Sequence, residues 1–109
     1  MRIWDLKPAR LCRKHLLGEH RELHGLWKIL TEGKKGYSLH PETLRWRGKL
    51  KALYHRHREL VKEMKRRHYN HNSPLDYRKA TGSAKQDVKL HTIKQQKEIL
   101  KAKGCECKT

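Results

Sequence analysis

The chain has 109 residues, a length that fits one domain with a single modest core. Lys and Arg number 28 against 11 Asp and Glu, so the formal net charge is +17 and a polyanion such as nucleic acid is the expected partner. No apolar run approaches the roughly 18 residues of a membrane span, and charges interrupt the opening segment, so we expect a soluble cytoplasmic protein with neither membrane partner nor signal peptide.

The sequence predicts an all-α fold of about three helices, preceded by an extended N-terminal segment. Pro8 suits a first helical turn, where its missing N–H costs nothing. Apolar residues then recur at helical spacing as far as Leu30, and Gly33 and Gly36 end the pattern. The polar residues on this apolar stripe are His15, Glu19 and Glu22.

A second helix is predicted from about Thr43 or Arg47 to Arg67, with one apolar side and one strongly basic side. Gly48, near its start, costs about 1 kcal/mol relative to Ala and leaves that boundary open. The outer face is expected to carry Arg47, Lys49, Lys51, Arg56, Arg58, Lys62, Lys65 and Arg66.

The rest of the chain is predicted to be a loop followed by a short helix. Residues 71–91 contain Asn, Ser, Pro and Gly, which favour a loop. Thr92 and Gln95 have the spacing of a capping box, so a last helix is expected over 92–104, ending at Gly104. We interpret residues 1–109 as a single compact domain.

The basic side of the second helix, together with Lys34 and Lys35, is a candidate phosphate-binding surface. A solvated charged face is the alternative, but the chain has too few acidic residues to balance these cations. Contacts to phosphates position DNA without reading its sequence. Affinity should then fall with salt, by a log–log slope of roughly −0.9 per phosphate neutralised.

Glu22 lies two turns after His15 on the same side of the first predicted helix. A carboxylate within an apolar stripe must be paired, protonated or solvated in a cleft. It either forms a salt bridge to an arginine of the second helix or acts as a general acid/base beside a nucleophile. The α-amine of Met1 is a candidate nucleophile, because an α-amine has an intrinsic pKa near ~8 and is partly neutral at physiological pH.

The histidines and cysteines provide a weaker metal hypothesis. His20 and His24 share a helix face at the spacing of zinc-protease helices, but Arg21 stands where those helices place Glu. Cys105 and Cys107 are two thiols without a nearby second pair, which makes a weak site. We therefore predict no metal site and no cofactor.

The start of the chain resembles the phage endonuclease V family, the pyrimidine-dimer DNA glycosylases with AP lyase activity. The resemblance is strongest over residues 1–70 and has no gaps at its start. It is carried by Met1-Arg2-Ile3, Leu11, His15-Leu16, Glu19 and Arg21-Glu22-Leu23, then by Arg58-Glu59-Leu60 and by the run from Lys65 to Asn70.

The resemblance implies a DNA repair activity in which the α-amine of Met1 attacks the sugar of a damaged nucleotide. The base leaves, an imine joins protein to DNA, and elimination cuts the strand. Glu22 is the implied acid/base, and Arg2 and Arg21 are implied to hold duplex DNA at a pyrimidine dimer or abasic site, where flipping a nucleotide is favoured. The enzyme is expected to be a monomer, and the further DNA-binding candidates are His15, His24, Lys34, Lys35 and Arg47.

Three departures from the family pattern are visible, and the first two bear on lesion specificity. Gly25 replaces a further arginine, the aromatic tail of the phage enzyme is absent, and His68 stands where a glycine is expected. Trp4, Trp27 and Trp46 are candidates to stack on a flipped base, with Trp27 the one that best fits a core position. The alternatives are a lyase restricted to abasic sites and a non-enzymatic basic nucleic-acid-binding protein.

Overall fold

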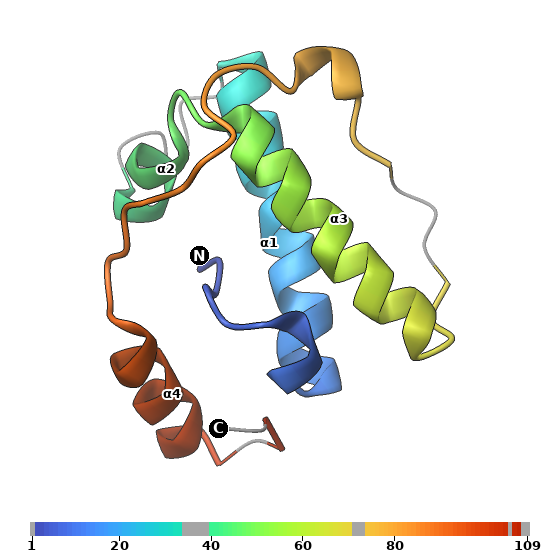
Figure 1. The fold of residues 1–109 in the computed structure, drawn as a ribbon, viewed down its shortest axis with the longest axis vertical. Coiled ribbons are helices and arrows are strands. Elements are labelled where there is room, and N and C mark those ends of the chain that lie inside the picture. The colour runs from blue at the N-terminus through green and yellow to red at the C-terminus, as the bar shows by residue number, and fades with distance from the viewer. Residues whose placement is uncertain (1, 34–39, 71–73, 105, 108–109) are drawn as a thin grey trace.

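A computed structural model of the chain describes residues 2–33, 40–70, 74–104 and 106–107. Across these residues the fold is all-α, as predicted (Figure 1). The elements in chain order are η1 (Pro8–Arg10), α1 (Arg13–Glu32), α2 (Pro41–Trp46), α3 (Leu50–Arg66), η2 (Tyr77–Lys79) and α4 (Ile93–Ala102), where η denotes a single turn of 3-10 helix.

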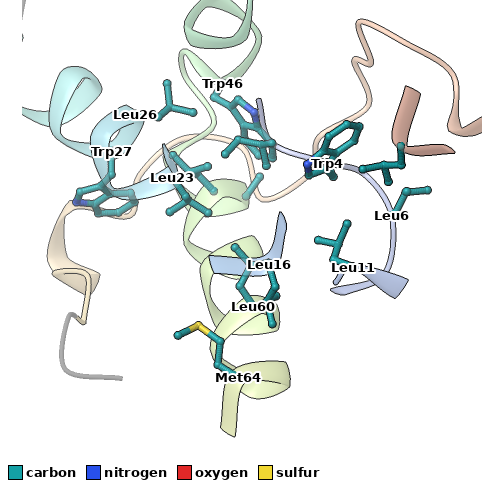
Figure 2. Close-up of a cluster of buried hydrophobic side chains, with 14 residues drawn as sticks. Trp4, Leu6, Leu11, Leu16, Leu23, Leu26, Trp27, Trp46, Leu60 and Met64 are labelled. Atoms are coloured by element: carbon teal, nitrogen blue, oxygen red, sulfur yellow. The ribbon is translucent and has the colours of Figure 1, made fainter. Parts of the chain in front are cut away.

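The two long helices, α1 and α3, pack side by side and bury their apolar stripes against each other (Figure 1). Figure 2 shows this core, with Leu16 of α1 beside Leu60 of α3 and the Trp27 ring farther along it. Burying one such leucine stabilises the fold by about 1.5–3 kcal/mol. The leucines with no exposed surface are Leu16, Leu23, Leu26, Leu53, Leu60 and Leu100.

The predicted start of the first helix is wrong, and so is the prediction of one continuous second helix. Pro8 begins the separate turn η1, and α1 begins only at Arg13. The second helix is two helices, because Gly48 adopts a φ of 75° between α2 and α3. This left-handed conformation is open to glycine and interrupts a right-handed helix.

The elements after α3 agree closely with the prediction made for them from the sequence. Thr92 and Gln95 form the expected capping box, and α4 ends two residues before Gly104. The described part of the 71–91 loop contains only the turn η2. His68 adopts a φ of 63°, the left-handed conformation that a glycine, present here in the family pattern, adopts readily.

The extended N-terminal segment is part of the core. Ile3, Trp4 and Leu6 are 2%, 5% and 3% exposed. Trp27 and Trp46 are buried as well, which confirms the core position expected for Trp27 and contradicts the stacking role considered for Trp46. Burial of residues so close to the chain start fixes the path of the segment, which determines the site described next.

Among the residues that the structure describes, no helix combines the length and the apolar character needed to cross a membrane.

Candidate active site

Two glutamates on α1 hold the extended N-terminal segment along the helix. The amide nitrogen of Arg2 donates to Glu22 Oε2 at 2.6 Å, and the amide nitrogen of Trp4 donates to Glu19 Oε1 at 3.1 Å. Alternate amides of an extended chain point to the same side, and helix residues three apart lie on the same face. The segment therefore follows α1 over one helical turn, with Arg2 at Glu22.

Glu19 also joins α1 to α3 through a buried ion pair. Arg56 Nε donates to Glu19 Oε2 at 2.7 Å, and a second guanidinium nitrogen donates to Oε1 at 3.0 Å. Burial raises the pKa of the Glu19 carboxyl, and the Arg56 charge and its hydrogen bonds act in the opposite direction. A salt bridge between Glu22 and an arginine of the second helix was one of the two expectations, but in the structure Glu19 forms this salt bridge, with Arg56. Arg56 is buried and therefore not on the exposed basic face where it was predicted.

Replacing Glu19 with Gln is expected to lower the free energy of unfolding by about 3–5 kcal/mol, because it removes the buried counter-charge of the Arg56 guanidinium and leaves only the exposed Glu59 carboxylate, 3.6 Å away. Chemical denaturation followed by circular dichroism measures this loss. Glu32→Gln is the matched control: Glu32 is exposed at the end of α1, and its replacement should cost less than about 0.5 kcal/mol. Equal effects of the two substitutions would contradict the anchoring role of Glu19.

Arg45 of α2 is a second buried anchor for the N-terminal segment. Its side chain forms a short ion pair with Asp5 and donates to the carbonyl of Ile3 at 3.2 Å. It also donates to Glu42 at 2.8 Å and to the carbonyl of Val88 at 2.6 Å. Sequence reasoning missed Arg45, because nothing local distinguishes it from the many solvated arginines of this chain.

Residues of α4 and of the chain that leads into it contact the N-terminal segment as well. Gln96 of α4 accepts from the Asp5 amide at 2.8 Å and donates to Asp5 Oδ2 at 2.9 Å. A guanidinium nitrogen of Arg2 lies 3.3 Å from His91 Nδ1. These contacts leave the Arg2 end of the segment between α1 and the chain that leads into α4.

A pocket of about 730 Å³ opens where Arg2 meets Glu22. This volume is typical of a small-molecule or single-nucleotide site. Glu22 is exposed at the pocket rather than part of the buried stripe on which the sequence placed it. The lining residues are Arg2, Trp4, Lys14, His15, Gly18, Glu19, Glu22, His40, Pro41, Glu42, Leu90, His91 and Lys103.

The pocket is lined by cationic side chains and by three carboxylates, and the environment of the Glu22 carboxylate differs from that of the other two. Lys14 and Lys103 add two ammonium groups to the guanidinium of Arg2. The other two lining carboxylates, those of Glu19 and Glu42, are each bound by a buried arginine, whereas Glu22 accepts the backbone amide of Arg2. Such a lining attracts phosphate oxygens and keeps a proton acceptor beside them.

His15 stands at the edge of the pocket, with its ring edge-on to Trp4 at 6.0 Å between centroids. Its Nδ1 lies 3.2 Å from Cys12 Sγ and 3.4 Å from Cys107 Sγ. Burial, followed by the charges of Lys103 and Lys14, lowers the pKa of His15. The imidazole is therefore held in its neutral form near pH 7.

The other predicted DNA-binding residues lie outside this pocket. Arg21 is exposed and lines a neighbouring pocket of about 540 Å³ together with Lys14. Arg47 is exposed at the end of α2. Met1, Lys34, Lys35 and Cys105 lie outside the described residues.

His24 belongs to a cluster of three histidines between α1 and α3. Its Nε2 lies 3.2 Å from that of His57, and the ring of His20 is 4.6 Å from that of His24 between centroids. Among the described residues, this cluster and the set of Cys12, His15 and Cys107 bring three donor atoms close enough to hold a metal ion. The spacing of His20 and His24 was visible in the sequence, whereas the approach of His57 from another helix was not.

The basic face of α3 is smaller than predicted. Lys49 contacts Gln86 and Asp87, and Arg66 pairs with Glu63. A second pocket, of about 680 Å³, lies along α3, and its lining contains Arg58, Lys62 and Lys65. These three side chains form a cationic surface separate from the pocket at Glu22.

Comparison with known proteins gives one match. A family model described as pyrimidine dimer DNA glycosylase matches residues 1–77, well over half of the chain. The matched range contains Arg2, Glu19, Glu22 and both long helices, and it ends before α4. No curated protein and no solved structure matches the chain.

Proposed function

Since the chain belongs to the pyrimidine dimer DNA glycosylase family, we propose that it excises the base of a cyclobutane pyrimidine dimer and then cleaves the strand as an AP lyase. Family membership supports the glycosylase activity and a DNA substrate. The proposal adds an imine intermediate formed by the α-amine of Met1, with Glu22 as acid/base. The enzyme acts as a monomer on duplex DNA and needs no cofactor for this chemistry.

The hydrogen bond between the Arg2 amide and Glu22, 2.6 Å long, is the observation that carries this proposal. The α-amine of Met1 belongs to the residue that precedes this amide. Covalent geometry keeps the two nitrogens within about 4 Å of each other, whatever the backbone conformation. The contact between the Arg2 amide and Glu22 supports the proposal that the α-amine acts with the Glu22 carboxylate, because a coupled nucleophile and base must lie close together.

The proposed reaction proceeds in two stages. The neutral α-amine adds to C1′ of the damaged nucleotide, the N-glycosidic bond breaks, and the base leaves with the electron pair of that bond. The sugar ring opens to an imine, with a proton delivered to O4′. Glu22 then accepts a proton from C2′, the C3′–O3′ bond breaks, and the 3′ strand leaves with its phosphate. Water hydrolyses the imine and regenerates the amine.

The cationic lining has a positioning role in this scheme. Arg2, Lys14 and Lys103 surround the pocket and would bind the phosphates that flank the flipped nucleotide. Arg21, one turn from the pocket edge, would extend these contacts along the strand. The contributions of His15, His24, Lys34, Lys35 and Arg47 stay predictions, and His24 lies on the opposite flank of α1.

Borohydride trapping tests the intermediate directly. Reduction converts the imine to a stable secondary amine, so incubation with duplex DNA and borohydride should yield a covalent protein–DNA adduct. We expect an adduct with a dimer-containing duplex and with an abasic duplex. Mass spectrometry of the digested adduct should place the sugar remnant on the N-terminal peptide.

An undamaged duplex of the same sequence is the control and should give no adduct. Absence of an adduct with both damaged substrates, from protein that still binds duplex DNA, would favour the non-enzymatic binding protein. An adduct on an internal lysine would retain the lyase but reject Met1 as its nucleophile.

A lyase restricted to abasic sites is the second candidate function. Burial of Trp27 and Trp46 favours it, because these two rings then supply no aromatic platform for a dimer and Trp4 is left, among the described residues, as the one tryptophan that lines the pocket. Cleavage of an abasic duplex without cleavage of a dimer-containing duplex would select this candidate. Cleavage of both substrates would select the glycosylase.

A further inference from the structure

Three potential metal ligands from opposite ends of the chain meet at the first turn of α1. Cys12 is the N-cap of α1, His15 lies in its first turn, and Cys107 follows α4. Cys12 and Cys107 are 95 residues apart in sequence, yet the Cys12 amide donates to Cys107 Sγ at 3.1 Å. The contact brings the tail of the chain to the start of α1.

The spacing of the donor atoms fits a tetrahedral ion. His15 Nδ1 lies 3.2 Å from Cys12 Sγ and 3.4 Å from Cys107 Sγ, and the three donor atoms all lie within 4.8 Å of one another. Zinc–sulfur bonds of about 2.3 Å and zinc–nitrogen bonds of about 2.0 Å at tetrahedral angles place sulfur and nitrogen roughly 3.5 Å apart. The two observed sulfur–nitrogen distances therefore lie within a few tenths of an ångström of those around a bound ion.

The surroundings favour thiolates, the form of cysteine that binds metal. Cys12 stands at the N-terminus of a 20-residue helix, where the helix dipole stabilises negative charge. The amide that donates to Cys107 Sγ adds a hydrogen bond that stabilises a thiolate in that position.

We propose that Cys12, His15 and Cys107 bind a zinc ion that fastens the C-terminal tail to the first turn of α1. Two thiolates and one imidazole supply three of the four ligands, and water or a further side chain completes the tetrahedron. All three residues are only partly buried, which leaves a path for the ion and for the fourth ligand. The site is structural and stands beside the pocket at Glu22, which His15 also lines.

The thiolate site is favoured over the three-histidine cluster for two reasons. Thiolate ligands bind zinc more strongly than they bind the hard cations that are more abundant in cells. The histidine cluster links α1 to α3, which already pack through leucines, and His24 Nε2 is within hydrogen-bond distance of His57 Nε2 without an ion. At Cys107, by contrast, a metal would join a residue that follows the last helix to the first turn of α1.

Metal analysis of the untagged full-length chain tests the proposal. Protein purified with reductant and excess zinc, then desalted, should retain about one zinc ion per chain. Cys12→Ser and Cys107→Ser should each lose most of that zinc. His24→Gln is the matched control, which removes a ligand from the other cluster and should keep the full equivalent.

Cobalt substitution supplies a second measurement that does not depend on activity. Co²⁺ in the parent chain should give thiolate charge-transfer absorption and the visible bands of a tetrahedral ion, and both should weaken in Cys107→Ser. This variant changes only the tail, so circular dichroism should show a folded protein even if Cys12→Ser unfolds. Zinc-free parent protein with titratable thiols, zinc retained by both cysteine variants, or zinc lost from His24→Gln would each overturn the proposal.

Discussion

Replacing Glu22 with Gln is expected to lower the rate of strand cleavage by about 10²–10⁴-fold, the usual contribution of a positioned general acid/base. The amide cannot take a proton from C2′, and it offers less electrostatic stabilisation to the developing positive charge on the sugar. Single-turnover cleavage of a dimer-containing duplex measures the effect on chemistry separately from product release.

The fold should survive this substitution. Glu22 is exposed, and a glutamine oxygen can still accept the amide hydrogen of Arg2. The melting temperature and the affinity for DNA should therefore stay close to those of the parent chain, as they should in the control Glu32→Gln, which is expected to keep full activity. Unchanged cleavage by Glu22→Gln would remove Glu22 from the mechanism and favour the binding-only alternative.

Blocking the α-amine of Met1 is expected to abolish both the borohydride adduct and cleavage. Acetylation withdraws the nitrogen lone pair into an amide, which cannot form an imine, and an N-terminal extension moves the amine away from Glu22. Duplex affinity should change little, because one blocked amine removes at most one of many positive charges. Cleavage assays and salt-dependent binding assays on the same preparation separate the two effects.

A removable extension provides the control. Proteolysis that leaves Met1 as the first residue should restore adduct formation and cleavage together. Full activity of the extended chain would instead assign the nucleophile to a lysine, and Lys14 and Lys103 are the lysines that line the pocket.

Three glycines show what the local sequence could not predict in this fold, namely where a helix is interrupted. Gly18 and Gly25 lie inside α1 without interrupting it, whereas Gly48 adopts a positive φ and separates α2 from α3. The intrinsic penalty of about 1 kcal/mol is the same at all three positions. At Gly18 and Gly25 the packing of α1 on α3 outweighs this penalty, so the helix continues. At Gly48 the chain must turn between α2 and α3, so the helix is interrupted.

The two glutamates of α1 show the same limit within the candidate site. Helical spacing places Glu19 and Glu22 on one flank of the helix, so the sequence could not tell which of them is buried. In the structure Glu19 forms the buried ion pair with Arg56, and Glu22 is exposed at the pocket, where it accepts the Arg2 amide. The resemblance had assigned the acid/base to Glu22, and that assignment stays a prediction.

The sequence by itself determined the helical class, the capping box of α4 and the strongly basic charge, because each depends on residues close together in the chain or on composition alone. Only the tertiary structure decided that Arg45 clamps the N-terminal segment, that His57 joins two histidines of α1, and that Cys107 meets Cys12. These contacts join residues 33 to 95 positions apart. No local periodicity or spacing encodes such pairs, since they form only when the whole core closes.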